Sequence, residues 1–155
     1  MGHKENRNTT QLCKGSAMNN EFEKYDTFTK QMEERFPMMF AGKYGGFCVG
    51  EGWWPILEEL CSNIQGHIAW QKGKCTQVTV AQIKEKYGGL RFYYDGGDDA
   101  IDGMVRMAES WAAHSCETCG APGERRQGGW IKTLCDHHET ERQQRIKQYE
   151  NQTSQ

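Results

Sequence analysis

The sequence has no apolar stretch of the roughly 18–20 residues that a membrane-spanning helix needs, so we expect no membrane segment. Residues 1–20 are polar and lack the apolar core of a signal peptide. Neither sign of charge is in large excess, because 19 Lys and Arg residues stand against 21 Asp and Glu residues. The net charge of -2 gives no general attraction for nucleic acid or for an anionic membrane. These absences predict a cytoplasmic protein.

Apolar residues are also scarce, at 36% of the chain against a usual value of about 45–50%. A chain of 155 residues therefore predicts one domain with a small core that depends on its aromatic side chains. The cysteine count of seven is odd, and without an export signal this argues against a disulfide framework. We expect the four dispersed cysteines to be reduced and to pack as small apolar side chains: Cys13, Cys48, Cys61 and Cys75.

Apolar periodicity and glycine placement predict an α+β fold. The first half of the chain predicts a flexible leader at 1–19, a helix from Asn20 that Pro37 ends, and a glycine-rich connection at 40–52. A second helix is expected to open at Trp53-Trp54-Pro55 and to end by Gly73. A hairpin of strands 77–80 and 90–94 follows, with a turn over 83–89, and then a third helix capped by Asp98. We therefore expect three helices and a β-hairpin in a core over 20–114, packed as one domain with a C-terminal metal finger over 115–150. A charged helical tail ends the chain.

The strongest motif is Cys116-x-x-Cys119-Gly120 followed by Cys135-x-x-His138. A tight turn can point the first two thiolates at one ion, and the last two side chains share one face at the start of a helix. The four ligands form a Cys₃His tetrahedron, a common closed arrangement for one structural Zn ion. His138 is favoured over His137, which would crowd Cys135. A short hairpin between the two pairs, with arms at 124–126 and 130–134, gives a segment that resembles a treble-clef zinc finger from Ser115 to about Gln148.

A second group of residues combines aromatic rings with positive charge. Its members are Lys43, Tyr44, Trp53, Trp54, Lys84, Lys86, Tyr87 and Arg91. Rings can stack on a base while cations and glycine amides hold phosphate, so the group suits a nucleotide-like ligand. The hairpin tip around Lys84, Lys86 and Arg91 is the expected functional surface. The alternative is that the rings form the core and the cations are solvated, since no phosphate-loop or dinucleotide spacing is present. His67 and His114 show no partner in the sequence.

Two other functions are open at this point. The finger region carries six basic residues that could contact nucleic acid: Arg125, Arg126, Lys132, Arg142, Arg145 and Lys147. Neighbouring acidic residues reduce the local charge to about +1, which makes a nucleic-acid-binding finger the less favoured reading. An enzyme is the second alternative. It ranks last because the sequence displays no nucleophile–base pair and no open metal site.

Three motifs together resemble a known family. They are the run Ile83-Lys-Glu-Lys-Tyr-Gly-Gly-Leu-Arg-Phe-Tyr93, the Cys-x-x-Cys-Gly-Ala-Pro-Gly knuckle and the Gly-Trp-Ile-Lys-Thr-Leu-Cys-Asp-His-His segment. From about Phe36 to His138, the chain resembles small uncharacterised bacteriophage and prophage proteins. The resemblance implies a phage origin and a metal, and small phage proteins often act on host machinery. The leading hypothesis is a non-enzymatic, zinc-stabilised accessory or counter-defence protein in the host cytoplasm. It would bind a host protein or a small anionic, nucleotide-like ligand.

Overall fold

The computed structural model describes residues 19–153, so most of the expected leader lies outside the described residues. The fold is α+β, as expected. Its elements in chain order are α1 (Asn19–Arg35), β1 (Phe47–Cys48), the 3₁₀ turn η1 (Glu51–Trp53), α2 (Trp54–Trp70), β2 (Thr76–Lys86), β3 (Gly89–Gly97), α3 (Asp99–Ala112), β4 (Glu124–Arg126), β5 (Lys132–Leu134) and α4 (Asp136–Thr153). Within this range, no helix combines the length and the apolar character that a membrane crossing requires.

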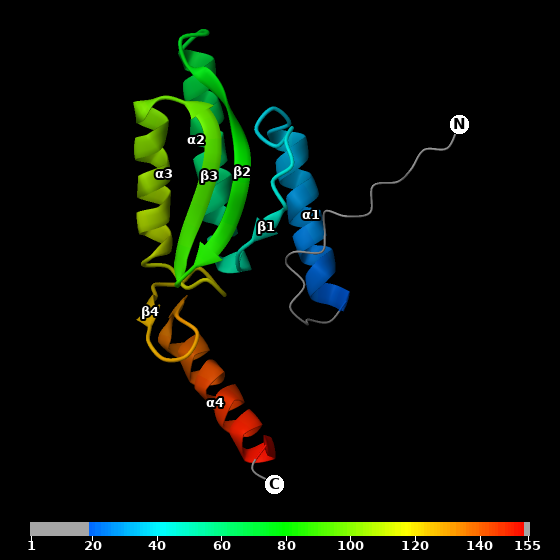
Figure 1. The fold of residues 1–155 in the computed structure, drawn as a ribbon, viewed down its shortest axis with the longest axis vertical. Coiled ribbons are helices and arrows are strands. Elements are labelled where there is room, and N and C mark those ends of the chain that lie inside the picture. Colours follow the sequence, from blue (N-terminus) through cyan, green and yellow to red (C-terminus); the bar gives the residue numbers. More distant parts are fainter. Residues whose placement is uncertain (1–18, 154–155) are drawn as a thin grey trace, which may run out of the picture.

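The centre of the fold is the long β2–β3 hairpin, which packs against α2 and α3, while α4 projects away from the core (Figure 1). The sheet has the order β1-β2-β3, with β1 parallel to β2 and β3 antiparallel to it. The short strand β1 lies inside the glycine-rich connection, where the sequence predicted no regular structure. It covers the outer edge of β2 that would otherwise expose unpaired backbone groups.

The hairpin differs from its prediction in the length of the turn. Only Tyr87 and Gly88 form the turn, and both have positive φ, at 52° and 75°, as in a two-residue type I′ turn. The expected turn over 83–89 is wrong because β2 continues to Lys86. Ile83 and Leu90 are fully buried, so the apolar alternation of the sheet runs through this segment and a register shift between Val80 and Gln82 keeps it in phase.

The predicted helices are present. Along α2, one face is buried and supplies Ile56, Leu57, Leu60, Cys61 and Ile64 to the core. The N-terminus of α3 is capped by Asp98, whose Oδ1 accepts from the N–H of Ile101 at 3.1 Å, as expected. In α1, Phe28 and Met32 are buried, and the ring of Phe28 stacks on Trp54 at 4.4 Å.

The finger region contains the β4–β5 hairpin and α4, which adds a fourth α-helix to the expected three. The first arm matches its prediction, and the second is shorter, at Lys132–Leu134 instead of 130–134. No side chain of α4 is buried among the described residues, which agrees with the predicted solvated tail. Several contacts attach the finger to the core, and two of them are buried hydrogen bonds. Trp53 Nε1 donates to Ser115 O at 2.8 Å, and Thr133 Oγ1 donates to Gly88 O at 2.6 Å.

Candidate functional site

The first two cysteines of the motif lie on a tight turn between α3 and β4, which we call the knuckle (residues 116–121). The N–H of Cys116 donates to Ala121 O at 2.7 Å, and the N–H of Gly120 donates to Cys116 O at 2.8 Å. Gly120 has a φ of 76°, a conformation that an L side chain would strain. These two backbone bonds close the turn and place both sulfurs on one side of it.

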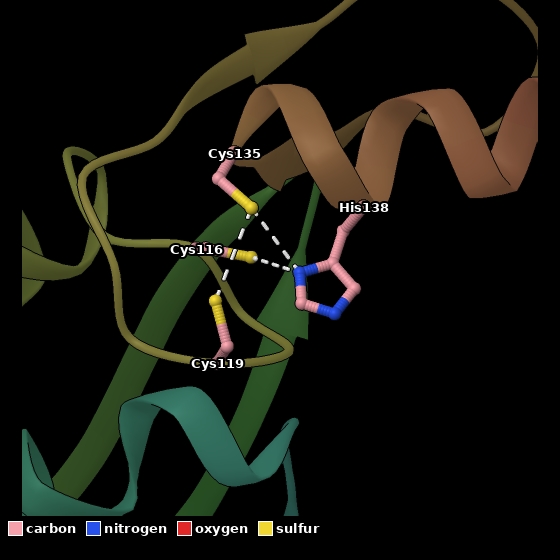
Figure 2. Close-up of side chains that lie close together, drawn as sticks. All are labelled: Cys116, Cys119, Cys135 and His138. Atoms are coloured by element: carbon pink, nitrogen blue, oxygen red, sulfur yellow. Dashed lines mark hydrogen bonds between the residues drawn. The ribbon is translucent and has the colours of Figure 1, made fainter.

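The other two side chains come from the start of α4. Cys135 precedes the helix, and its carbonyl accepts from the N–H of Glu139 at 3.0 Å. His138 lies in the first turn and directs Nδ1 towards the three sulfurs (Figure 2). His137 instead faces Glu141, with Nε2 at 3.4 Å from Oε1, and its side chain is 74% exposed. The structure therefore brings His138, the favoured histidine, to the three cysteines.

The four ligand atoms have the spacing of a tetrahedral metal site. Nδ1 of His138 is 3.2 Å from Cys135 Sγ and 3.5 Å from Cys116 Sγ, and the sulfurs of Cys119 and Cys135 are 3.9 Å apart. All four atoms lie within 4.8 Å of one another. An ion with bonds of about 2.3 Å to sulfur and about 2.0–2.1 Å to nitrogen has S···S edges near 3.8 Å and S···N edges near 3.6 Å. The cluster can hold a metal ion with little rearrangement.

Electrostatics in the knuckle favour a thiolate at Cys116. Burial raises the pKa of this thiol, but hydrogen bonds from the backbone N–H groups of Cys135, Cys119 and Thr118 outweigh burial and lower the pKa to about 6. At Cys119 the balance is reversed. The N–H of Ala121 lowers its pKa, whereas burial and the other two sulfurs raise it, and the net pKa is raised. A bound cation would stabilise the additional thiolates, because metal binding displaces their protons.

Among residues 19–153, the dispersed cysteines do not form a second cluster of thiols. Cys61 and Cys75 are free and buried, as expected, and burial raises the pKa of Cys61 to about 12. Cys48 is disulfide-bonded, so the expectation of a reduced thiol is wrong at this position. Linear spacing does not show which cysteines meet in the fold. Cys13 lies outside the described residues.

A large cleft of about 1030 Å³ lies between the core and the finger. One wall comes from α1 and the glycine-rich connection, and the other comes from the knuckle, β5 and the first turns of α4. The lining residues used below are Asp26, Glu33, Lys43, Tyr44, Glu51, Lys84, Glu85, Glu117, Trp130, Lys132, His138 and Arg145. The lining of the cleft therefore comes from both halves of the chain, and it includes His138 of the Cys₃His cluster.

The carboxylates of the cleft are mostly engaged. Glu117 is only 7% exposed; its Oε2 lies 2.8 Å from Lys132 Nζ, and its Oε1 accepts from the N–H of Gly50 at 3.1 Å. Glu85 is 3.5 Å from the same ammonium group. Glu33 accepts from the hydroxyl of Tyr44 at 2.7 Å. These contacts satisfy the carboxylate oxygens, and Lys132 balances one of the three negative charges.

Several cations of the cleft are not paired in this way. Among residues 19–153, Lys43, Lys84 and Arg145 form no ion pair, although Lys84 lies over the ring of Tyr93 at 5.3 Å. Asp26 is the single lining carboxylate that, in the same range, has neither an ion pair nor a side-chain hydrogen bond. Three cations of the lining therefore have no carboxylate partner among the described residues.

The structure divides the proposed ligand residues into two sets. Lys43, Tyr44 and Lys84 line the cleft. Trp53 is fully buried and Trp54 packs against Phe28, as in the alternative that assigned the rings to the core.

The remaining three, Lys86, Tyr87 and Arg91, are outside the cleft, and Arg91 lies 3.7 Å from Glu109. The hairpin tip is occupied by structural contacts. The N–H of Gly88 donates to Glu85 Oε1 at 2.7 Å, and its carbonyl accepts from Thr133. The expected exposed amides are therefore absent at Gly88, and this glycine instead docks the finger.

Half of the basic residues of the finger are held in ion pairs. Arg126 contacts Glu124 at 2.7 Å and Asp136 at 2.6 Å, and Arg142 contacts Glu139 at 3.3 Å. Together with Lys132, three of the six basic residues are held in ion pairs within the described part of the chain. This arrangement leaves less positive charge for a nucleic-acid backbone than the sequence count indicates.

Comparison of the chain with protein-family models, with curated proteins and with solved structures gives no match.

Sequence reasoning missed the buried ion pairs of the cleft. Glu117 lies between the first two cysteines of the motif, and Lys132 lies in β5. Nothing in their spacing shows that they meet, because their approach depends on the pairing of the knuckle with β5, where the N–H of Glu117 donates to Thr133 O at 2.9 Å. The only hint in the sequence is the charge of Glu117 between Cys116 and Cys119. A charged residue at such a position is more simply expected to face solvent, so the hint does not predict a buried ion pair.

Proposed function

We propose that the Cys₃His cluster holds one structural zinc ion in a treble-clef-like finger. The supporting observation is the fit of its S···S and S···N separations to tetrahedral edges. Zinc prefers this donor set and this geometry, and four protein ligands form a closed site. The Nε2 atom of His138, on the far side of the ring, faces Glu141 Oε2 at 3.9 Å, where a carboxylate can orient a ligating imidazole through a modest movement.

The function that the geometry supports best is non-enzymatic binding of a small anionic, nucleotide-like ligand in the cleft. The observation that carries this proposal is that most carboxylates of the cleft are already held by contacts within the protein, whereas Lys43, Lys84 and Arg145 have no carboxylate partner among the described residues. Trp130, which is 71% exposed, supplies an aromatic face to the lining, whereas the ring of Tyr44 is buried in the core. Cations hold phosphate groups while ring faces stack on a base.

The test measures the thermal stability of zinc-loaded protein with ATP, AMP, adenosine and inorganic phosphate as probes. A probe present at 100 times its Kd stabilises the folded protein by about 2.7 kcal/mol, which corresponds to a rise in Tm of roughly 5–10 °C for a chain of this size. We expect the nucleotides to produce the largest shift, because phosphate lacks a ring and adenosine lacks charge.

Matched lysine variants locate the binding. The double variant Lys43→Ser/Lys84→Ser should weaken binding by at least about tenfold per removed lysine, since a charge-assisted contact contributes about 1.5–3 kcal/mol. Lys86→Ser is the control, because Lys86 is exposed on the same hairpin but outside the cleft. Equal affinity in the double variant and the wild type, or no shift with any probe, would contradict the proposal. A larger shift with a short single-stranded RNA would favour nucleic acid.

The resemblance to phage proteins supplies the biological setting of the proposal. A phage accessory or counter-defence protein that binds a small anionic ligand would act by removing it from the host cytoplasm. Binding of a host protein is the other form of this proposal. Affinity purification from expressing cells, with mass spectrometry of both proteins and small molecules, separates the two, because a captured nucleotide and a captured protein appear in different fractions.

A further inference from the structure

A histidine, a cysteine and an aspartate meet at the end of the core that is remote from the finger. The ligand atoms of His67, Cys75 and Asp98 all lie within 4.8 Å of one another. His67 Nε2 is 2.8 Å from Asp98 Oδ2, and Cys75 is 6% exposed. The sequence showed no partner for His67, and the proposed ligand cleft does not use any of the three.

Three features of the fold bring these side chains together. A turn after α2, with positive φ at Lys72 and Gly73, reverses the chain and returns Cys75 towards His67. The first residue of β2 then pairs with the last residue of β3, and Thr76 Oγ1 donates to Gly97 O at 3.3 Å. Asp98 follows that pair directly. The three residues therefore come from the end of α2, the start of β2 and the N-cap of α3.

The aspartate is oriented for a second contact. Its Oδ1 caps α3 by accepting from the N–H of Ile101, which leaves Oδ2 directed at His67. The helix N-terminus also favours negative charge at this position. The side chain of His67 is 13% exposed and that of Asp98 is 34% exposed, so the buried thiol and the carboxylate lie at the boundary between core and solvent.

We propose that His67, Cys75 and Asp98 form a second metal site, with three protein ligands and one position open to solvent or to a ligand, selective for zinc-like divalent ions. Thiolate, imidazole and carboxylate are all zinc ligands, and three protein ligands with one open position are typical of sites where the metal contacts water or substrate. The ion occupies the space between Nε2, Sγ and Oδ2.

The adjustment that metal binding requires is small. Two ligands bound at about 2.0–2.1 Å in a tetrahedron lie about 3.3 Å apart, so His67 Nε2 and Asp98 Oδ2 must separate by roughly half an ångström. The neutral imidazole then carries its proton on Nδ1, and the thiol proton of Cys75 leaves to solvent. Neither change requires the backbone of α2 or α3 to move.

This site is independent of the finger. It lies beside the Thr76–Gly97 end of the hairpin, whereas the finger docks at the Gly88 turn at the other end. With 11 residues in β2 and a rise of about 3.3 Å per residue, the two ends are separated by roughly 30 Å. A variant at one cluster therefore leaves the ligands of the other in place.

The test titrates Co²⁺ into protein that already carries one equivalent of Zn²⁺. Cobalt bound by a thiolate gives a charge-transfer absorption band, and the band reports Cys75 directly. We expect one further equivalent to bind with this band in the wild type, the band to disappear in Cys75→Ser, and the affinity to fall by more than about tenfold in His67→Gln. Native mass spectrometry of zinc-titrated protein should show two ions per chain in the wild type.

Two further variants keep the test informative. Asp98→Asn retains the helix cap, since asparagine caps as well as aspartate, so a loss of cobalt affinity reports the lost ligand and not a frayed helix. His114→Gln is the control for His67→Gln, because His114 is exposed and belongs to no cluster in the described residues. The proposal is overturned if no second equivalent binds, or if a second equivalent binds equally well to Cys75→Ser, His67→Gln and Asp98→Asn.

Discussion

Replacing Gly52 with alanine tests whether the finger is held to the core by direct contact between backbones. Gly52 lies in η1, against the knuckle, and its N–H donates to Glu117 O at 2.8 Å. A Cβ atom at this position would stand 2.2 Å from Cys116 O and 2.5 Å from Gly120 N. Real Cβ atoms essentially never come within 3.0 Å of another heavy atom. The knuckle and η1 must therefore separate by roughly 0.8 Å, and rigid backbone on both sides opposes that shift.

The expected loss of stability follows from two contributions. Overpacking at a well-packed contact costs about 1–3 kcal/mol, and weakening the hydrogen bond to Glu117 costs about 1 kcal/mol. A total of about 2–4 kcal/mol lowers Tm by roughly 5–15 °C for a chain of this length. Because the clashing atoms belong to the knuckle, we also expect the metal that we propose for the finger to bind about tenfold more weakly, which corresponds to about 1.4 kcal/mol of the strain.

The matched control is Gly103→Ala in the middle of α3. A Cβ atom there meets no heavy atom within 4 Å, so alanine should stabilise the protein by about 0.5–1 kcal/mol through its higher helix propensity. Urea denaturation followed by circular dichroism measures both variants, and competition with a chromogenic chelator measures metal affinity. If Gly52→Ala matches the wild type in stability and in metal affinity, the core and the finger are not in the contact described above.

Two further predictions concern charged and titrating groups of the cleft. Lys132→Met leaves the carboxylates of Glu85 and Glu117 without their shared cation, so it should lower the free energy of unfolding in urea denaturation by about 2–4 kcal/mol. Lys132→Arg should retain most of this stability. If Lys132→Met is as stable as the wild type, the ion pairs contribute little. Burial and the hydrogen bond to Glu33 raise the pKa of Tyr44 far above its ordinary value of 10.0, so the unfolded chain ionises first and stability falls as the pH rises above about 10, by up to about 1.4 kcal/mol per pH unit. Tyr44→Phe should reduce this loss between about pH 10 and pH 11, and an unchanged pH dependence would contradict the assignment.

The parts of the fold that sequence predicted are those that depend on short-range geometry. The knuckle needs only two cysteines and a glycine in one turn, and the second ligand pair needs only the start of a helix. Asp98 caps α3 because a side-chain oxygen three residues before Ile101 can reach its N–H. In each case the residues that interact are at most a few positions apart, so their spacing determines the contact.

Contacts made through tertiary packing could not be predicted in this way. His67 and Asp98 are brought together only when β2 pairs with β3, and the register shifts between Thr76 and Thr79 and between Val80 and Gln82 cannot be counted from the sequence. The hairpin tip was assigned to ligand binding because lysines, an aromatic ring and glycines gather there. Glycines serve equally well for close packing. A Cβ atom at Gly88 would lie only 3.2 Å from the side chain of Ile131.

The arrangement of the finger would let a metal ion in the Cys₃His cluster influence the cleft without contact with a ligand. One wall of the cleft is made of core residues and the other of finger residues, and His138 belongs to both the metal cluster and the lining. Glu117, whose carboxylate pairs with Lys132, lies between two cysteines of the cluster. A metal that fixes the knuckle therefore also fixes the position of this carboxylate and of Lys132. The finger wall of the cleft is thus positioned by the same backbone turn that forms the candidate metal site.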